Sequence, residues 1–441
     1  MELGDVAPRD ALFEYGQDAL LEGYTDLVDA LERAGAAPLK KYELVPAVLV
    51  RGAPGALLAA ADGSKPTRVS SDAPMVLASG GSPTRGAGPQ LSNADWALNL
   101  SWLHESLLEP DGSGVRIGLV DTAIDVNHPA LLEARGRIRR HPPPAWAVHE
   151  KSGPFPHGHG TATCSLLVGR TPGGFALGWC PGASIEVFET VGNDGTAALS
   201  AVLHAVEELV LREDVDVLLV PLNFLPGEFV TRAGGQLLVT SEDPGKLLSA
   251  ALSAATKEGT WVVIPSGNFG PELGTVGYDA RDGGVFLAGA AGRLGWDGSA
   301  KPAFFSGRPG PAAGRELERP ILLPGTEVLC AKPPGVRFGE GPAEGAFARA
   351  SGTSFAAAFL AALLAVARGV TPDLAAGTAR EALAAATDGG RRVVDVERYA
   401  TTLGILHPVP PRLSRFYLQN LGWALALTLA ILALLAVLRL A

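Results

Sequence analysis

Apolar residues in this chain gather into short runs that end in glycine or in polar residues. Residues 115–120 form a nearly continuous apolar run that stops at Asp121, and residues 261–265 form a second one, so both predict buried strands. The longer small-residue runs at 162–168 and 355–367 predict buried helices. Buried strands alternating with buried helices favour an α/β fold built on a parallel sheet.

The first 78 residues carry a separate set of shorter elements. Helical spacing of apolar residues predicts a helix within 19–34, an apolar run predicts a strand at 42–50, and a second short helix is expected at 54–61. The segment 79–95 is rich in glycine, serine and proline and therefore reads as a flexible linker. A small α+β domain over residues 1–78 is the expectation.

The C-terminal end carries a membrane signal. Residues 421–438 are 18 residues without a charge, which as a helix would span about 27 Å, enough for a bilayer core. Arginines and boundary aromatics mark its ends: Arg412, Arg415, Tyr417, Trp423 and Arg439. A transmembrane helix over 420–438 behind a juxtamembrane segment 406–419 is predicted; a buried C-terminal core helix is the alternative.

The flanking sequence gives an expected orientation. Residues 1–6 are acidic and lack an apolar h-region, so no secretory signal peptide is expected. Two arginines precede the apolar stretch and one follows it, a bias for keeping the preceding domain cytoplasmic. We therefore expect a single-pass C-terminal membrane anchor with the rest of the chain in the cytoplasm.

Composition removes several partner classes. The 441 residues carry 36 lysines and arginines against 46 acids, a net charge of −10 that disfavours nucleic acid as a partner. Cys164, Cys180 and Cys330 are an odd set in apolar or small-residue surroundings, which favours buried thiols over a disulfide or metal set. No metal-ligand spacing stands out, so neither a metal nor a cofactor is expected.

Three polar residues punctuate the apolar runs. Asp121 ends a predicted parallel strand, where open α/β sheets build their sites. His159 precedes Gly-Thr and the helix at 162–168, and Ser354 follows Gly-Thr and opens the helix at 355–367. Taken singly, these are ordinary turn, loop and N-cap residues. Together, in the order Asp, His, Ser, they are the groups of a nucleophilic triad.

The chemistry requires these residue types. A serine hydroxyl is a poor nucleophile at neutral pH, so an imidazole must take its proton during attack. A buried carboxylate fixes the tautomer of that imidazole and stabilises the imidazolium. Ser354 lies near a predicted helix N-terminus, where free amides and the helix dipole favour developing negative charge.

The three motifs resemble those of the subtilisin-like serine peptidases, the subtilase family, over roughly residues 95–400. The resemblance implies a subtilisin-like parallel sheet flanked by helices, in a peptidase domain over 96–405. It also implies that Asp121, His159 and Ser354 are catalytic and that the side-chain amide of Asn268 donates to the oxyanion. Residues implied to bind substrate are Gly195, Leu222, Asn223, Ser266 and Gly267.

The N-terminal domain adds to this resemblance. Its order of helix, strand and helix resembles the inhibitory prodomain that precedes many of these peptidases, and an unrelated α+β appendage is the alternative. The chain departs from the family pattern at Pro221 and Asn223, where the family carries Ser-Leu-Gly, at 358–359, where it carries Pro-His, and at 269–271. Because proline lacks an amide donor and glycine leaves room for substrate, these departures indicate an unusual cleft.

The sequence therefore predicts a membrane-tethered serine endopeptidase with few substrates, made as a self-inhibited precursor, a zymogen. Its partners would be a protein or peptide substrate, the membrane through the C-terminal helix, and possible components of a membrane complex. The alternative is a peptidase-shaped scaffold subunit of a membrane complex in which proteolysis is incidental. Esterase or amidase action on small substrates would use the same groups.

Overall fold

The computed structural model describes the chain in two parts. Before residue 111 the described residues are 9–15, 24–53, 56–57, 59–61, 68–71 and 74–77. From 111 to 405 the gaps are 148–156, 175, 193–194, 225–229, 234–235, 240–244, 272, 274–275, 277–283, 295–299, 309–318, 341–343 and 388–392. The predicted linker at 79–95 and the predicted transmembrane helix at 420–438 lie outside the described residues.

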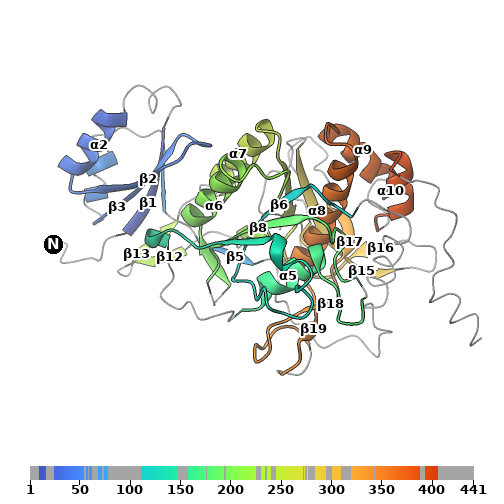
Figure 1. Cartoon of the computed structure of the whole chain (residues 1–441). Coiled ribbons are helices and arrows are strands. Elements are labelled where there is room, and N and C mark those ends of the chain that lie inside the picture. The colour runs from blue at the N-terminus through green and yellow to red at the C-terminus, as the bar shows by residue number, and fades with distance from the viewer. Residues whose placement is uncertain are drawn as a thin grey trace, which may run out of the picture.

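The larger part is built on one sheet with the strand order β16-β15-β14-β10-β6-β8-β7, and β17 also pairs with β15 (Figure 1). All neighbouring pairs are parallel except β15 and β16. The strands are β6 (Arg116–Asp121), β7 (Ile138–His141), β8 (Ser184–Glu189), β10 (Val217–Leu219), β14 (Trp261–Pro265), β15 (Val285–Leu294), β16 (Ala300–Pro302) and β17 (Ile321–Pro324). The prediction of an α/β fold on a parallel sheet is confirmed.

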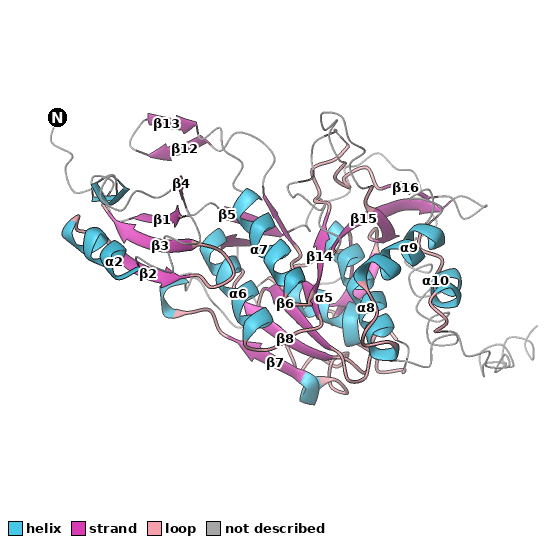
Figure 2. Ribbon diagram, turned by 90° about the horizontal axis from the view of Figure 1, so that it is seen from above, coloured by secondary structure: helices cyan, strands magenta, loops and turns pink. Residues whose placement is uncertain are grey.

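Helices cover both faces of this sheet (Figure 2). One face packs on α5 (His159–Val168), α8 (Thr353–Val370), α9 (Ala376–Ala386) and α10 (Val396–Thr402), and the other on α6 (Leu199–Leu211) and α7 (Gly245–Lys257). Alternate strand residues point to opposite faces: Ile117 and Leu119 join the first core, whereas Val120 joins the second. Burial on both faces explains why the strands read as continuous apolar runs.

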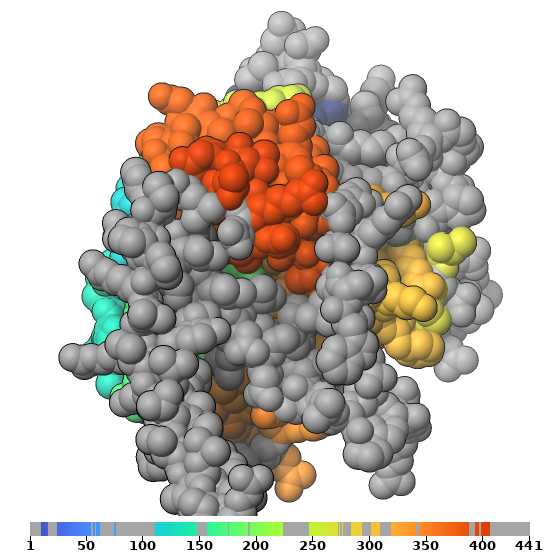
Figure 3. Space-filling view, turned by 90° about the vertical axis from the view of Figure 1, so that its right-hand side faces the viewer, coloured from blue at the N-terminus to red at the C-terminus, as the bar shows by residue number. Residues whose placement is uncertain are grey.

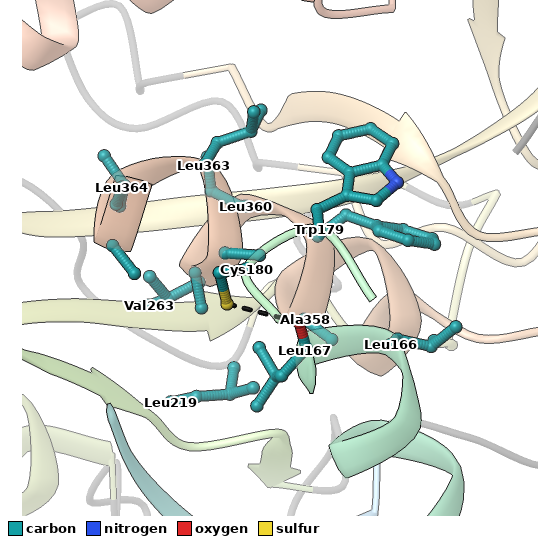
Figure 4. Close-up of a cluster of buried hydrophobic side chains, with 14 of the residues drawn as sticks. Leu166, Leu167, Trp179, Cys180, Leu219, Val263, Ala358, Leu360, Leu363 and Leu364 are labelled. Atoms are coloured by element: carbon teal, nitrogen blue, oxygen red, sulfur yellow. Dashed lines mark hydrogen bonds between the residues drawn. The ribbon is translucent and has the colours of Figure 1, made fainter. Parts of the chain in front are cut away.

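Helix α8 lies at the centre of the first core. Its residues from Thr353 to Ala367 are all buried, and Figure 4 shows its leucines among those of α5 beside Trp179 and Cys180. The rings of Phe359 and Trp179 lie 4.5 Å apart between centroids. Among the described residues, α8 is the one helix whose length and composition would suit a membrane span, but it is 83% buried, as a soluble core helix is.

Helices α9 and α10 form the outer surface of this layer, on the side of the molecule shown in Figure 3. Asp395 caps α10 by accepting a 3.0 Å hydrogen bond from the amide of Arg398. Arg380 of α9 donates to the carbonyl of Val285 in β15 at 2.6 Å, with its guanidinium over the ring of Phe286. The contacts of Arg380 thus join α9 to β15 of the main sheet.

The N-terminal part forms its own antiparallel sheet in the order β2-β3-β1-β4. Its elements are β1 (Arg9–Glu14), α2 (Tyr24–Arg33), β2 (Ala37–Lys41), β3 (Ala47–Gly52) and β4 (Arg68–Ser71), and residues 56–57 and 59–61 are helical. The strand expected at 42–50 begins only at Ala47. Residues 42–46 form a turn instead, since Pro46 has no amide hydrogen to give to a ladder.

Three small sheets complete the described structure. Their strands are β5 (Pro74–Leu77), β9 (Thr196–Ala198) and β11 (Leu222–Phe224) in one sheet, β12 (Val230–Ala233) with β13 (Gln236–Val239), and β18 (Val328–Ala331) with β19 (Phe347–Ala350). Two 3-10 helices, Arg135–Arg137 and Ala145–Ala147, lie in connections. The apolar run at 216–222 thus contains two strands, because the chain leaves the main sheet at Pro221 and pairs elsewhere.

The position of Phe359 gives a test of the core. Phe359→Ala removes a fully buried ring from α8, and we expect it to lower the free energy of unfolding by about 3–5 kcal/mol. Val370→Ala, at the exposed end of the same helix, should change it by about 0.5 kcal/mol or less. Urea unfolding followed by circular dichroism measures both, and equal effects would contradict the central place given to α8.

Candidate active site

The first site residue lies where the central strand of the sheet stops. Asp121 is the last residue of β6 and its side chain is fully buried. Its Oδ1 accepts a 2.7 Å hydrogen bond from the amide of Thr122. A buried carboxylate is costly unless it is hydrogen-bonded, so this position requires further partners close by.

His159 supplies the second partner of that carboxylate. It opens α5, and its Nδ1 lies 2.7 and 2.9 Å from the two oxygens of Asp121. Because an ionised carboxylate only accepts hydrogen bonds, Nδ1 donates to it, and in a neutral imidazole Nε2 then has the lone pair. His159 is fully buried, and its Nε2 has no hydrogen-bond partner among the described residues.

The close approach of α5 to β6 depends on glycine. A Cβ atom placed on Gly160 would lie 2.3 Å from the carbonyl oxygen of Thr122, a distance that no side chain could keep. The amide of Gly160 instead donates to the hydroxyl of Thr122 at 2.8 Å. The His-Gly-Thr motif thus brings the imidazole within hydrogen-bonding distance of Asp121.

Ser354 lies at the N-terminus of α8 and is fully buried. Its Oγ donates a long hydrogen bond of 3.4 Å to the carbonyl of Pro221, and none to His159 is formed. Gly352 is the N-cap residue and makes no side-chain bond, and the amides of Thr353 and Phe355 already donate to Asn268 and to the carbonyl of Gly352. Phe355, the next residue, packs on the imidazole of His159 with ring centroids 5.7 Å apart.

Asn268 follows β14 in the turn that faces the start of α8. Its Oδ1 accepts from both the amide and the hydroxyl of Thr353, each at 3.0 Å. With the oxygen held on that side, the amino group of Asn268 points away from Thr353. The structure therefore brings a side-chain N–H donor beside the residue that precedes Ser354.

The five predicted substrate-binding residues differ in their surroundings. Leu222 buries its side chain in the second core, so only its backbone could contact a substrate. Ser266 Oγ is 3.2 Å from Ser306 Oγ, and Gly195 has the positive φ of 76° that its turn before β9 requires. Asn223 and Gly267 face each other directly: a Cβ on Gly267 would meet Asn223 Nδ2 at 2.1 Å.

Sequence reasoning missed the strand that pairs with the predicted substrate-binding segments. Pro74–Leu77, as β5, lies between β9 and β11 and pairs antiparallel with both. Leu77 is opposite Leu222, and Val76 is opposite Asn223. The only sequence signal was a short apolar stretch, 75–77, immediately before the linker.

Aromatic rings that the sequence did not place surround the histidine. The ring of Phe338 lies 6.3 Å from that of His159, 6.1 Å from His157 and 6.3 Å from Phe355. Phe338 belongs to the connection between β18 and β19, about 180 residues from His159. These contacts keep water away from the imidazole.

One group of described residues has the composition of a metal site. Ligand atoms of His141, Glu186 and Glu213 lie within 4.8 Å of one another. However, His141 Nε2 is 2.8 Å from Glu186, and Arg139 lies 3.4 Å from both glutamates. The two carboxylates thus already have cationic and hydrogen-bonding partners on the sheet edge.

The three cysteines are free thiols and fully buried. Burial raises the pKa of Cys164 and Cys180, with smaller contributions from Asp121 and from neighbouring acids, and raises that of Cys330 to about 12. A thiol held in its neutral form is a poor nucleophile, so none of the three is a candidate for that role.

Known proteins share this architecture. The family model described as "Subtilase family" matches residues 112–401. The chain is 24% identical over 298 residues to subtilisin DY of Bacillus licheniformis, covering 66% of this chain and 92% of that protein. It is 26% identical over 182 residues to subtilisin BL of Lederbergia lenta, covering 41% of this chain and 56% of that protein.

The solved structures agree in fold. Fervidolysin from Fervidobacterium pennivorans, described as a keratinolytic enzyme related to subtilisin, superposes with a TM-score of 0.59 at 17% identity. The alignment covers 93% of this chain and 62% of that one, and at this identity it speaks for the fold alone. Since the family model covers well over half of the chain, the protein belongs to the subtilase family of serine peptidases.

Proposed function

We propose that this protein is a membrane-tethered serine endopeptidase that hydrolyses peptide bonds through Asp121, His159 and Ser354, and that it is made as a self-inhibited precursor. The observation that carries the proposal is the buried hydrogen bond of 2.7 Å between His159 Nδ1 and Asp121. In the neutral imidazole this bond fixes the proton on Nδ1, so that Nε2, which is buried as the Ser354 hydroxyl is, would have the lone pair that a base requires.

In the first half of the reaction, Ser354 Oγ turns from the Pro221 carbonyl toward His159 Nε2. Its long 3.4 Å bond to Pro221 is weak and is given up at little cost. As Oγ attacks the substrate carbonyl carbon, its proton passes to Nε2. The carbon–nitrogen bond then breaks, that proton goes to the leaving amine, and an ester on Ser354 remains.

In the second half, water reverses these steps. His159 Nε2 takes a proton from a water molecule, the hydroxide attacks the ester carbon, and Ser354 Oγ regains the proton as it leaves. In both halves the negative charge on the substrate oxygen is stabilised by donors at fixed positions. The amino group of Asn268, whose side-chain oxygen is held by Thr353, and the backbone amide of Ser354 near the N-terminus of α8 are suited to this role.

The N-terminal domain is proposed to inhibit this site by occupying it. Strand β5 completes a three-stranded sheet with β9 and β11, as a bound peptide would. The rest of the domain rests on α6: the hydroxyl of Tyr42 donates to Ser200 at 2.9 Å, and the Glu207 carboxylate accepts from the amides of Glu43 and Leu44. Lys40 pairs with the same glutamate at 2.7 Å.

The restricted substrate range and the anchor are parts of the same proposal. Asn223 stands in the cleft where the family pattern has glycine, which narrows the space for substrate. The apolar stretch 420–438 would hold the peptidase at a membrane, with the catalytic domain on the cytoplasmic side as the arginine bias favours. A tethered enzyme with a narrow cleft meets few substrates.

A scaffold role is the second candidate, and one observation favours it. Ser354 Oγ is bonded to Pro221 and not to His159, so the nucleophile and base are not joined in this state. In that case Ser354→Ala would replace the wild-type protein fully in the cell, whereas loss of residues 406–441 would not.

The triad is tested by labelling the detergent-solubilised full chain with a fluorophosphonate probe. Ser354→Ala should abolish labelling, and Asp121→Asn should lower kcat on a cleaved peptide by about 10⁴-fold, because the imidazole loses its tautomer. Ser113→Ala, an exposed serine at the far end of β6, is the matched control and should label like the wild type. Equal labelling of Ser354→Ala and wild type would refute the proposal.

Self-processing predicts a defined cut. Because Leu77 pairs with Leu222, the next residue of a strand in this register would lie opposite Pro221. The carbonyl of Pro221 accepts the hydrogen bond from Ser354 Oγ. We therefore expect wild-type protein to be cleaved between Ala78 and Ser79, and Ser354→Ala to stay full length. Intact mass and N-terminal sequencing measure this. Identical masses for the two proteins would rule out self-processing and leave catalysis open.

The anchor is tested by extraction of membranes with alkaline carbonate. The full chain should stay in the membrane pellet, and a chain ending at Ile405 should be released. A full-length variant with Leu429→Arg and Leu432→Arg tests the apolar stretch without shortening the chain. Each arginine at mid-span costs about 2.5–3.5 kcal/mol of insertion free energy, so this variant should also be released. Release of the unmodified full chain would exclude a transmembrane anchor.

A further inference from the structure

Asn223 is a polar side chain whose burial the triad does not explain. It lies in β11, fully buried, and neither its Nδ2 nor its Oδ1 has a hydrogen-bond partner among the described residues. A buried amide without a partner is rare in folded proteins, because both of its polar ends lose their bonds to water. Its partner is therefore to be sought in a molecule that enters the cleft.

The side chain of Asn223 fills the gap between two segments of the cleft. It reaches from β11 to Gly267, where an added Cβ would lie 2.1 Å from Nδ2. Gly267 has a φ of 88°, a conformation that other residues rarely adopt, and it stands one residue before Asn268. The amide thus closes the space between the strand that pairs with β5 and the turn that carries the oxyanion donor.

The register of β5 relates this gap to the bond that is cleaved. Val76 is opposite Asn223, and side chains two residues apart on a strand share one face. In a substrate strand bound in this register, the residue opposite Pro221 is two positions beyond the one opposite Asn223. That residue precedes the scissile bond, since Ser354 Oγ lies at the Pro221 carbonyl. Its side chain is therefore directed to the face that Asn223 occupies.

We propose that Asn223 restricts this peptidase to substrates with alanine or serine before the scissile bond, and that its amide hydrogen-bonds the serine hydroxyl. The inference rests on the peptidase activity proposed above. A leucine or phenylalanine side chain would meet the Asn223 amide in the gap and would keep both of its polar ends unpaired. A short side chain leaves the amide in place, and a hydroxyl gives it a partner.

The chain's own sequence agrees with this restriction. Position 78, from which the register predicts the first cut, is alanine. A bulky residue there would place a large side chain at the closed gap, so a small residue is what self-cleavage by this site requires.

The test uses the full chain and four peptides that differ only in the residue before the scissile bond: alanine, serine, leucine or phenylalanine. Wild-type kcat/KM should be about 100-fold higher for alanine than for phenylalanine, and a few-fold higher for serine than for alanine. Asn223→Gly opens the gap and should raise the phenylalanine-to-alanine ratio at least about tenfold while removing the serine preference. Asn127→Gly, an exposed asparagine outside the cleft, is the matched control and should keep the wild-type ratios.

The outcomes separate this inference from the one on which it rests. Cleavage with the same phenylalanine-to-alanine ratio in wild type and Asn223→Gly would overturn the role of Asn223 and leave the peptidase intact. A wild type that prefers phenylalanine would overturn it as well. If wild type neither cleaves a peptide nor takes the fluorophosphonate, the peptidase proposal fails, and this inference fails with it. Thermal melting of each variant shows whether a changed ratio comes from a folded protein.

Discussion

The hydrogen bond between Asp121 and His159 constrains the rest of the molecule. Both side chains are fully buried, so neither can take a bond to water in place of the other. Helix α5 must therefore begin within hydrogen-bonding distance of the end of β6, and Gly160 is the residue that allows it to come so close. Once α5 is fixed in this way, α8 packs against it and places Ser354 in the same buried region.

The departure of the chain from the main sheet at Pro221 connects the fold to the proposed inhibition. Beyond that point β11 pairs with no strand of the main sheet and offers its edge to β5. The same N-terminal part contributes Leu12, Tyr42 and Leu49 to the core that covers α6 and α7. A single apolar cluster thus joins the domain proposed to inhibit with the domain proposed to catalyse. The N-terminal part therefore contacts the rest of the chain in two places, through β5 on β11 and through this cluster on α6 and α7.

Much of the peptidase fold could be predicted from the sequence. Strands β6 and β14 and helices α5 and α8 lie within a few residues of their expected positions, because long apolar runs with polar or glycine ends mark buried elements clearly. The pairing of Asp121 with His159 followed from the order of the motifs, and the structure brings the two together. The catalytic and binding roles of the individual residues stay predictions.

Other features had no local signal. Strand β5 has only four residues, and its partners lie more than a hundred residues away, so its place in the cleft depends on tertiary structure. Leu222 looked like a cleft residue, but the alternation of β11 turns its side chain into the core. The position of Phe338 on His159 likewise joins distant segments through a connection of irregular structure. The periodicity of apolar residues describes one helix or strand at a time and does not predict contacts between segments that are distant in the sequence.

The burial of all three thiols has a consequence for where the enzyme can work. Reducing compartments keep thiols free, whereas oxidising ones favour disulfides. The three cysteines form no disulfide and are held as buried neutral thiols: Cys164, Cys180 and Cys330. Neither glutathione nor oxidants can therefore react with them in the folded protein. The described part of the fold therefore contains no disulfide whose reduction would destabilise it.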